Sequence, residues 1–172
     1  IRDRPKIGEA PISISGFGDG YADFTIRKVG KVTDELFNLK KGSNIFIRGC
    51  YGNGWPTEQL KGKNVVIIAG GTGVSPVKSL INQLYSEPGY AKEIYLILGF
   101  KNSQSILFTD ELEQWKQAGH FHVICTLDNE DYPGWNKGMG TEFVKEIPFS
   151  SFGGNYECLV TVSYTQLSLP TN

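Results

Sequence analysis

The chain has 172 residues, of which 40% are hydrophobic and 20% charged, proportions that suit one globular domain and part of another. Its 17 basic and 18 acidic residues give a net charge of −1 without any basic block, which argues against nucleic acid as a partner. Apolar runs such as residues 65–69 are too short to span a membrane, and no signal peptide is visible. The three cysteines, Cys50, Cys125 and Cys158, are spaced too widely for a disulfide framework, a metal site or an iron–sulfur motif. We therefore expect a cytoplasmic protein.

Residues 1 to about 62 are predicted to be rich in β structure. Three alternating stretches are typical of strands: 11–15 (PISIS), 23–29 (DFTIRKV) and 44–48 (NIFIR). The glycines of 16–20 predict a turn. Thr33, followed by two acids, supplies a capping hydroxyl for a short helix that we expect to end at Lys41-Gly42.

From residue 64 the pattern changes to an alternation of strands and helices, which is typical of a parallel α/β sheet. Further strands are predicted at 93–99 and 121–127, and another beginning at 157–160. Helices are predicted at 109–117, capped by Thr109, and at 141–147. The fold class is therefore α/β with a partial β-barrel: an incomplete antiparallel barrel followed by a parallel-sheet, Rossmann-like domain.

The stretch 64–85 (NVVIIAGGTGVSPVKSLINQLY) carries the clearest binding signal. A buried apolar strand is followed by a glycine turn, and Ser75-Pro76 then reads as the capped start of a helix with one apolar stripe. Such a turn directs free N–H groups and a helix dipole at one point, where a dinucleotide pyrophosphate can bind. The third glycine of the Rossmann fingerprint is absent, and an ordinary tight turn without ligand is the alternative.

The two modules, in this order, resemble the ferredoxin–NADP reductase superfamily, in which a flavin-binding barrel precedes a pyridine-nucleotide domain. The stretches GEAPISISGFG, TIRKVGKVTDELFNLKKGSNIFIRGCYGNGW and VVIIAGGTGVSPVKSLI, supported by LGFKNSQSILFTDEL, are most similar to the electron-transfer flavoprotein subunit of anaerobic sulfite reductase. The hydrogenase gamma subunit and the electron-transfer subunit of dihydroorotate dehydrogenase share much of this pattern. The resemblance covers about residues 8–160.

The resemblance implies two sets of cofactor-binding residues. For FAD they are Pro11, Ile12 and Ser13 along the flavin ring, Thr25, Ile26 and Arg27 beside its ribityl and phosphate groups, and Val32 and Thr33 at its pyrophosphate. For NAD(P)H they are Gly70, Gly71, Thr72, Gly73 and Ser75, with Tyr51, Gly52 and Asn53 in a loop between flavin and nucleotide. No side chain is assigned as catalytic, and none as a metal ligand.

Several of these residues have a simpler interpretation that the sequence leaves open. Thr33 can be a helix cap alone, Arg27 a solvated strand residue, and Cys50, where the family more often has proline, a small buried residue. Lys101, after the strand at 93–99, fits either a 2′-phosphate or solvent, so the choice between NADH and NADPH stays open.

The expected domains are 1–62, the C-terminal part of an FAD-binding barrel, and 63–160, the NAD(P)-binding domain, with 161–172 as a non-native tail. By resemblance, electrons pass from NAD(P)H through FAD towards iron–sulfur and sirohaem subunits of a sulfite reductase. An iron–sulfur cluster is expected only in the full-length protein, because this chain, which does not begin with methionine, lacks the cysteine cluster. The 172-residue chain is expected to retain little FAD and not to oxidise NAD(P)H. The alternatives are a hydrogenase gamma or dihydroorotate dehydrogenase electron-transfer subunit, or a nucleotide-binding module without redox activity.

Overall fold

The computed structural model describes residues 7–162, and the chain divides into two compact units between Trp55 and Pro56. The stretch 56–62, which the sequence assigned to the first domain, therefore groups with the second unit. Residues Tyr164, Leu167 and Leu169 of the expected tail lie outside the described residues.

The first unit contains a hairpin and a short helix: β1 (Ile14–Gly18), β2 (Tyr21–Phe24) and α1 (Lys31–Phe37). The predicted strand at 11–15 and turn at 16–20 are both shifted, since Gly18 pairs with Tyr21 across a two-residue loop. That loop is Asp19-Gly20, and Gly20 has a φ of +77°. Asp-Gly is a favoured hairpin loop because its glycine adopts a positive φ at no steric cost. The prediction overlooked this signal.

The predicted strands at 23–29 and 44–48 are largely wrong. Strand β2 ends at Phe24, and the second stretch contributes only an isolated bridge residue, Phe46. Alternation produces a strand only where a neighbouring strand supplies hydrogen-bond partners and a surface to bury the apolar face. In the described part of this unit the side chains of Ile45, Phe46 and Ile47 are 39%, 57% and 54% exposed.

The second unit is a parallel α/β sheet with the strand order β6-β5-β4-β3-β7. Its strands are β3 (Asn64–Gly70), β4 (Ile94–Phe100), β5 (Phe121–Leu127), β6 (Asn136–Lys137) and β7 (Tyr156–Val162). Its α-helices are α2 (Val74–Ser86) and α3 (Thr109–Gln117). Short 3₁₀ helices are η1 (Thr57–Leu60), η2 (Gly71–Gly73), η3 (Ser103–Ser105), η4 (Gly140–Glu146) and η5 (Phe149–Phe152). The predicted fold class, with a small antiparallel sheet before a parallel one, is confirmed.

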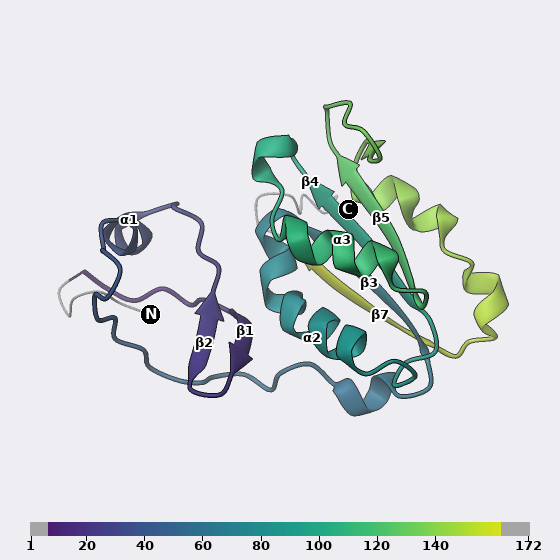
Figure 1. The fold of residues 1–172 in the computed structure, drawn as a ribbon, viewed down its shortest axis with the longest axis horizontal. Coiled ribbons are helices and arrows are strands. Elements are labelled where there is room, and N and C mark those ends of the chain that lie inside the picture. Colours follow the sequence, from purple (N-terminus) through teal and green to yellow (C-terminus); the bar gives the residue numbers. More distant parts are fainter. Residues whose placement is uncertain (1–6, 163–172) are drawn as a thin grey trace, which may run out of the picture. The chain divides into compact units, whose positions relative to one another are not determined.

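Both faces of this sheet are covered, as parallel sheets require. Helices α2 and α3 pack on one face, where they contact β3, β7 and β5 (Figure 1). On the other face Val66 and Ile97 form a cluster with Ile147 and Phe152, which come from the segment that carries η4 and η5. Because successive strand residues point to opposite faces, the continuous apolar runs of β3 and β4 serve both layers. This is why those strands were correctly predicted from sequence.

The helix starts differ from the predicted caps. The N-cap of α2 is Gly73 rather than Ser75, which lies inside the first turn. The N-cap of α3 is Phe108, in the left-handed conformation (φ 60°), so Thr109 is the first helical residue and not the cap. The predicted helix at 141–147 is the 3₁₀ helix η4. Cap identity depends on how the preceding loop arrives, which propensity alone does not specify.

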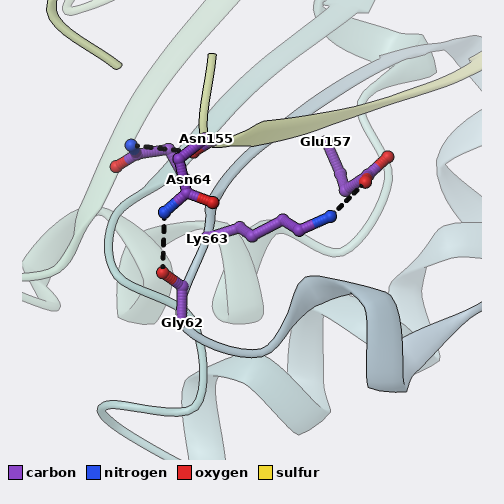
Figure 2. A network of polar contacts seen from close by, with 5 residues as sticks. All are labelled: Gly62, Lys63, Asn64, Asn155 and Glu157. Atoms are coloured by element: carbon purple, nitrogen blue, oxygen red, sulfur yellow. Dashed lines mark hydrogen bonds and ion pairs between the residues drawn. The ribbon is translucent and has the colours of Figure 1, made fainter. Parts of the chain in front are cut away.

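Strand β3 and the edge strand β7 are joined at their amino ends by a polar network (Figure 2). The main-chain N–H and the side-chain Nδ2 of Asn64 donate to the carbonyl of Asn155, at 3.2 and 3.3 Å. The side chain of Asn155 donates to the carbonyl of Gly62 at 3.3 Å, and the Lys63 ammonium contacts the Glu157 carboxylate at 2.6 Å. These contacts hold β7 in register with β3.

Helices α2 and α3 are linked by an ion pair between Lys78 and Glu111, with Nζ and Oε1 3.0 Å apart. The Lys78 side chain is 11% exposed, and its ammonium lies 5.0 Å from the centre of the Phe108 ring. A buried ammonium that loses its carboxylate keeps its desolvation cost without the compensating attraction.

We therefore expect Glu111→Gln to lower the free energy of unfolding by about 1–3 kcal/mol. Glu113 on the same helix pairs with Lys116 at 2.9 Å, but its side chain is 63% exposed. Glu113→Gln is thus a matched control that should change stability by less than about 0.5 kcal/mol. Urea unfolding followed by circular dichroism measures both, and equal effects would contradict the role given to the buried pair.

Candidate functional site

The carboxyl ends of the parallel strands meet at one edge of the sheet, and the chain reverses its direction of winding there. From β3 the chain moves through β4 and β5 to one side, whereas β7 lies on the other side of β3. In open α/β sheets a ligand binds outside the carboxyl ends at such a switch point. Here that position is the junction of β3 and β7, where the predicted glycine turn begins.

The glycine turn follows β3 directly and forms the 3₁₀ helix η2 before α2 begins. Gly71 has a φ of +54°, a left-handed conformation that favours glycine, and open space lies where a Cβ would stand. Gly73 has an ordinary helical φ of −65° and is buried. The turn therefore brings unencumbered main chain and the start of a 13-residue helix to the switch point, as an anion site requires.

Ser75 lies in the first turn of α2, and it is 3% exposed. Its hydroxyl has no hydrogen-bond partner in the described part of the protein. A buried hydroxyl without a partner costs about 1–3 kcal/mol, so such groups often mark functional positions. This hydroxyl lies at a helix N-terminus beside the glycine turn, and the role of Ser75 at a phosphate remains a prediction.

Thr161, at the carboxyl end of β7, was not among the predicted site residues, because the sequence pattern placed it in the tail. It lies within the sheet, and its Oγ1 donates to the carbonyl of Gly73. The signal that could have found it is a hydroxyl at the end of the strand that flanks the glycine turn. Strand order, which local sequence does not reveal, was needed to recognise it.

The loops after β4 and β5 contribute polar groups at the same edge. The Glu130 carboxylate accepts hydrogen bonds from the main-chain N–H and the hydroxyl of Ser103, each at 2.7 Å. The main-chain bond, with the hydroxyl bond second, lowers the pKa of Glu130. Lys101, the residue considered for a 2′-phosphate, is exposed. The first N–H of η3, that of Ser103, is thus already bonded to the Glu130 carboxylate.

In the first unit the Thr33 hydroxyl accepts hydrogen bonds from the N–H groups of Val29 and Gly30, at 2.9 and 3.0 Å, and donates to the Gly30 carbonyl. Thr33 is therefore buried inside the first turn and closes it, which supports the simpler interpretation of this residue. Thr25 donates to the hydroxyl of Ser15 at 3.0 Å, so it braces the hairpin. The pyrophosphate role of Thr33 and Val32 remains a prediction.

The other cofactor-binding residues predicted in the first unit are mostly on its surface. Exposed ones are Pro11, Ser13, Arg27, Tyr51, Gly52 and Asn53, and half-buried ones are Ile12, Ile26 and Val32. Glu9, just before this set, accepts a 2.6 Å hydrogen bond from Arg48, whose guanidinium lies 5.7 Å from the Tyr51 ring centre. That contact brings the segment before Pro11 near the loop that carries Tyr51.

Cys50 is exposed, contrary to the interpretation of it as a small buried residue. Cys158 is exposed and Cys125 is buried, and burial raises the pKa of the Cys125 thiol to about 11. Residues 7–162 contain no group of three or more side chains placed to bind a metal ion. Within that range we also find no helix with the length and apolarity needed to cross a membrane.

Residues 67–151 match the family described as the oxidoreductase NAD-binding domain. These residues are therefore similar to the NAD-binding domains of oxidoreductases. The fold is shared with a Neisseria gonorrhoeae ferredoxin NADP+ reductase, solved with bound FAD and NADP, at a TM-score of 0.63 and 15% identity over 87% of this chain and 64% of that one. The fold is also shared with an Amycolatopsis cytochrome P450 reductase, at a TM-score of 0.66 and 23% identity over 87% of this chain and 46% of that one.

Curated relatives are similar over most of the chain. The gamma subunit of sulfhydrogenase 1 from Pyrococcus furiosus is 32% identical over 83% of this chain and 50% of its own length. A probable dihydroorotate dehydrogenase B electron-transfer subunit from the same organism is 33% identical over 90% of this chain and 55% of its own length. The chain thus spans about half the length of these relatives. These similarities support the alternative prediction, a hydrogenase gamma or dihydroorotate dehydrogenase electron-transfer subunit, better than the prediction of a sulfite reductase subunit.

The cysteines give a test of the structure of both units. At pH 8 a thiol with a pKa of about 11 is about 0.1% thiolate, so Cys125 should react with iodoacetamide far more slowly than Cys50. Raising the pH towards 11 increases the thiolate fraction and should increase the labelling of Cys125. Mass spectrometry of peptides after brief labelling measures each site. Equal labelling of Cys50 and Cys125 in folded protein at pH 8 would contradict this assignment, and urea-unfolded protein provides the control.

Proposed function

We propose that this chain is part of an electron-transfer flavoprotein subunit that accepts electrons from NAD(P)H and passes them through FAD to a partner subunit. Among the candidates, the gamma subunit of a hydrogenase or the electron-transfer subunit of a dihydroorotate dehydrogenase is preferred to the sulfite reductase subunit. The similarity to relatives that bear those names supports this choice. The second unit, from Pro56 onward, is proposed as the NAD(P) domain, and the first unit as part of the FAD domain.

The observation that carries the proposal is the unpartnered, buried hydroxyl of Ser75 beside the glycine turn at the switch point. A ligand phosphate would give this hydroxyl the acceptor that the described part of the protein does not provide. Gly70, Gly71, Thr72 and Gly73 would leave room for the pyrophosphate and direct main-chain N–H groups towards it.

When bound, the two cofactors supply hydride transfer between nicotinamide and flavin and the onward delivery of electrons. The protein then needs no acid–base pair, and its task is to bind and orient. Pro11, Ile12 and Ser13, with Thr25, Ile26 and Arg27, are proposed to line the flavin. The exposed guanidinium of Arg27 is suited to a charge-assisted bond with a phosphate.

A nucleotide-binding module without redox activity is the second candidate. It is favoured by the local use of the Thr33 hydroxyl, which leaves fewer groups for FAD in the first unit.

The dinucleotide assignment predicts that Gly73→Val weakens binding of NADH or NADPH about tenfold or more, or about 1.4 kcal/mol. The helical φ of −65° is open to valine, so backbone strain would not cause the loss, and because Gly73 is buried a melting curve checks that the variant folds. Gly119→Val is the matched control, because open space surrounds Gly119 and it lies in the turn before β5. Nucleotide fluorescence titration measures the affinities, and unchanged binding by the Gly73 variant would contradict the site.

The redox assignment is tested by the absorption spectrum of the complete protein. We expect a visible flavin absorption band, which NADH or NADPH bleaches because hydride reaches the flavin. Ser13→Ala should lower flavin occupancy, because one lost hydrogen bond weakens the free energy of flavin binding by about 1 kcal/mol. Ser43→Ala, in the exposed turn after α1, is the control. A colourless complete protein that still binds the nucleotide would favour the second candidate.

A further inference from the structure

We propose that Thr161 is a positioning residue that holds the glycine turn in the conformation that receives the dinucleotide, an inference that rests on the proposed function. The Thr161 hydroxyl reaches from the last strand of the sheet to the carbonyl of Gly73, at the start of α2. Thr161 thus acts on a ligand through the main chain of the turn.

The geometry of the sheet brings this hydroxyl to the turn. Strand β7 runs parallel to β3, with Thr161 opposite Ala69 and Val162 opposite Gly70. The side chain of Thr161 is partly buried on the face of the sheet where β7 also contacts α2 and η2. The hydroxyl is therefore placed against the first residues after β3, which are those of the turn.

The register on which this contact depends is held at the opposite end of the same two strands. There Asn64 donates twice to the carbonyl of Asn155, and Lys63 pairs with Glu157 (Figure 2). A slip of one residue would turn the Thr161 side chain to the other face of the sheet. The network of Figure 2 thus specifies which β7 residue meets the turn.

The hydrogen bond constrains the turn because a peptide group is planar. The carbonyl of Gly73 and the N–H of Val74 belong to one peptide group, and that N–H donates to the carbonyl of Gly71. With Thr161 bound to the oxygen, the peptide group is held at both ends, from β7 on one side and from Gly71 on the other. Linked hydrogen bonds of this kind strengthen one another.

A turn that contains Gly70, Gly71 and Gly73 has many accessible conformations when nothing holds it. A ligand that binds only one of them loses affinity in proportion to how rarely that conformation is populated. The Thr161 hydroxyl offsets this loss by ordering the turn before the dinucleotide arrives.

Thr126 provides a matched control within the same sheet. It lies near the carboxyl end of β5, is fully buried, and its hydroxyl has no partner in the described residues. Thr161→Val and Thr126→Val therefore remove the same hydroxyl from the same edge, but only the first removes a hydrogen bond. Thr161→Ser keeps the hydroxyl and removes the methyl group.

The experiment compares the 172-residue chain with these three variants in two measurements. The first is amide hydrogen exchange of residues 71–75 without ligand. The second is titration with NADH and with NADPH. We expect Thr161→Val to speed exchange in the turn and to weaken nucleotide binding about fivefold to tenfold, with Thr161→Ser and Thr126→Val within about twofold of wild type. Melting curves report whether each variant folds.

The outcomes separate the inference from the function on which it rests. If the wild-type chain binds nucleotide and Thr161→Val binds it with the same affinity, the inference is overturned and the proposed function is not. Equal loss in Thr161→Ser and Thr161→Val would also overturn it, because the methyl group and not the hydroxyl would then matter. Failure of the wild-type chain to bind either nucleotide would overturn the proposed function. In that case hydrogen exchange still decides whether Thr161 orders the turn. An unchanged exchange rate of residues 71–75 in Thr161→Val would contradict that role.

Discussion

The parallel pairing of β3 with neighbours on both sides is the constraint on which the second unit depends. Strand β3 is bonded to β4 on one edge and to β7 on the other, and its side chains are buried on both faces. Because all these strands run the same way, every carboxyl end lies at one edge. The glycine turn, the start of α2 and the end of β7 meet there only because β3 stands between β4 and β7.

The two ends of this strand pair differ in how their polar groups are satisfied. At the amino end, Asn64, Asn155, Lys63 and Glu157 form mutual hydrogen bonds and an ion pair. At the carboxyl end Ser75 has a buried hydroxyl without a partner among the described residues. A network with every member bonded specifies one arrangement, whereas an unpartnered buried group lowers stability unless a ligand bonds it. The amino end thus specifies the register, and the carboxyl end carries the proposed binding site.

The first unit shows the limit of reading strands from alternation. Its hairpin is small, and the apolar side chains of 45–47 are exposed in the described part of the unit. Two-stranded sheets are marginal in water, because they bury too little apolar surface to offset the ordering of the chain. The residues predicted at the flavin lie on this unit, so their role stays a proposal, whereas the NAD-binding domain is matched independently.

The sequence by itself determined β3, β4, β5 and β7, the helices α2 and α3 and the place of the glycine turn, but not the two-residue strand β6. Apolar runs such as 65–69 and the helical stripe from Val77 to Leu84 depend on burial that any compact packing provides, so periodicity is enough to find them. The tertiary structure alone decided that β7 lies beside β3, that Gly73 and not Ser75 caps α2, and that Thr161 reaches the turn. The first and third of these features join residues far apart in the chain, and the cap depends on how the preceding turn leaves β3. Their energies depend on strand order and register, which no local pattern encodes.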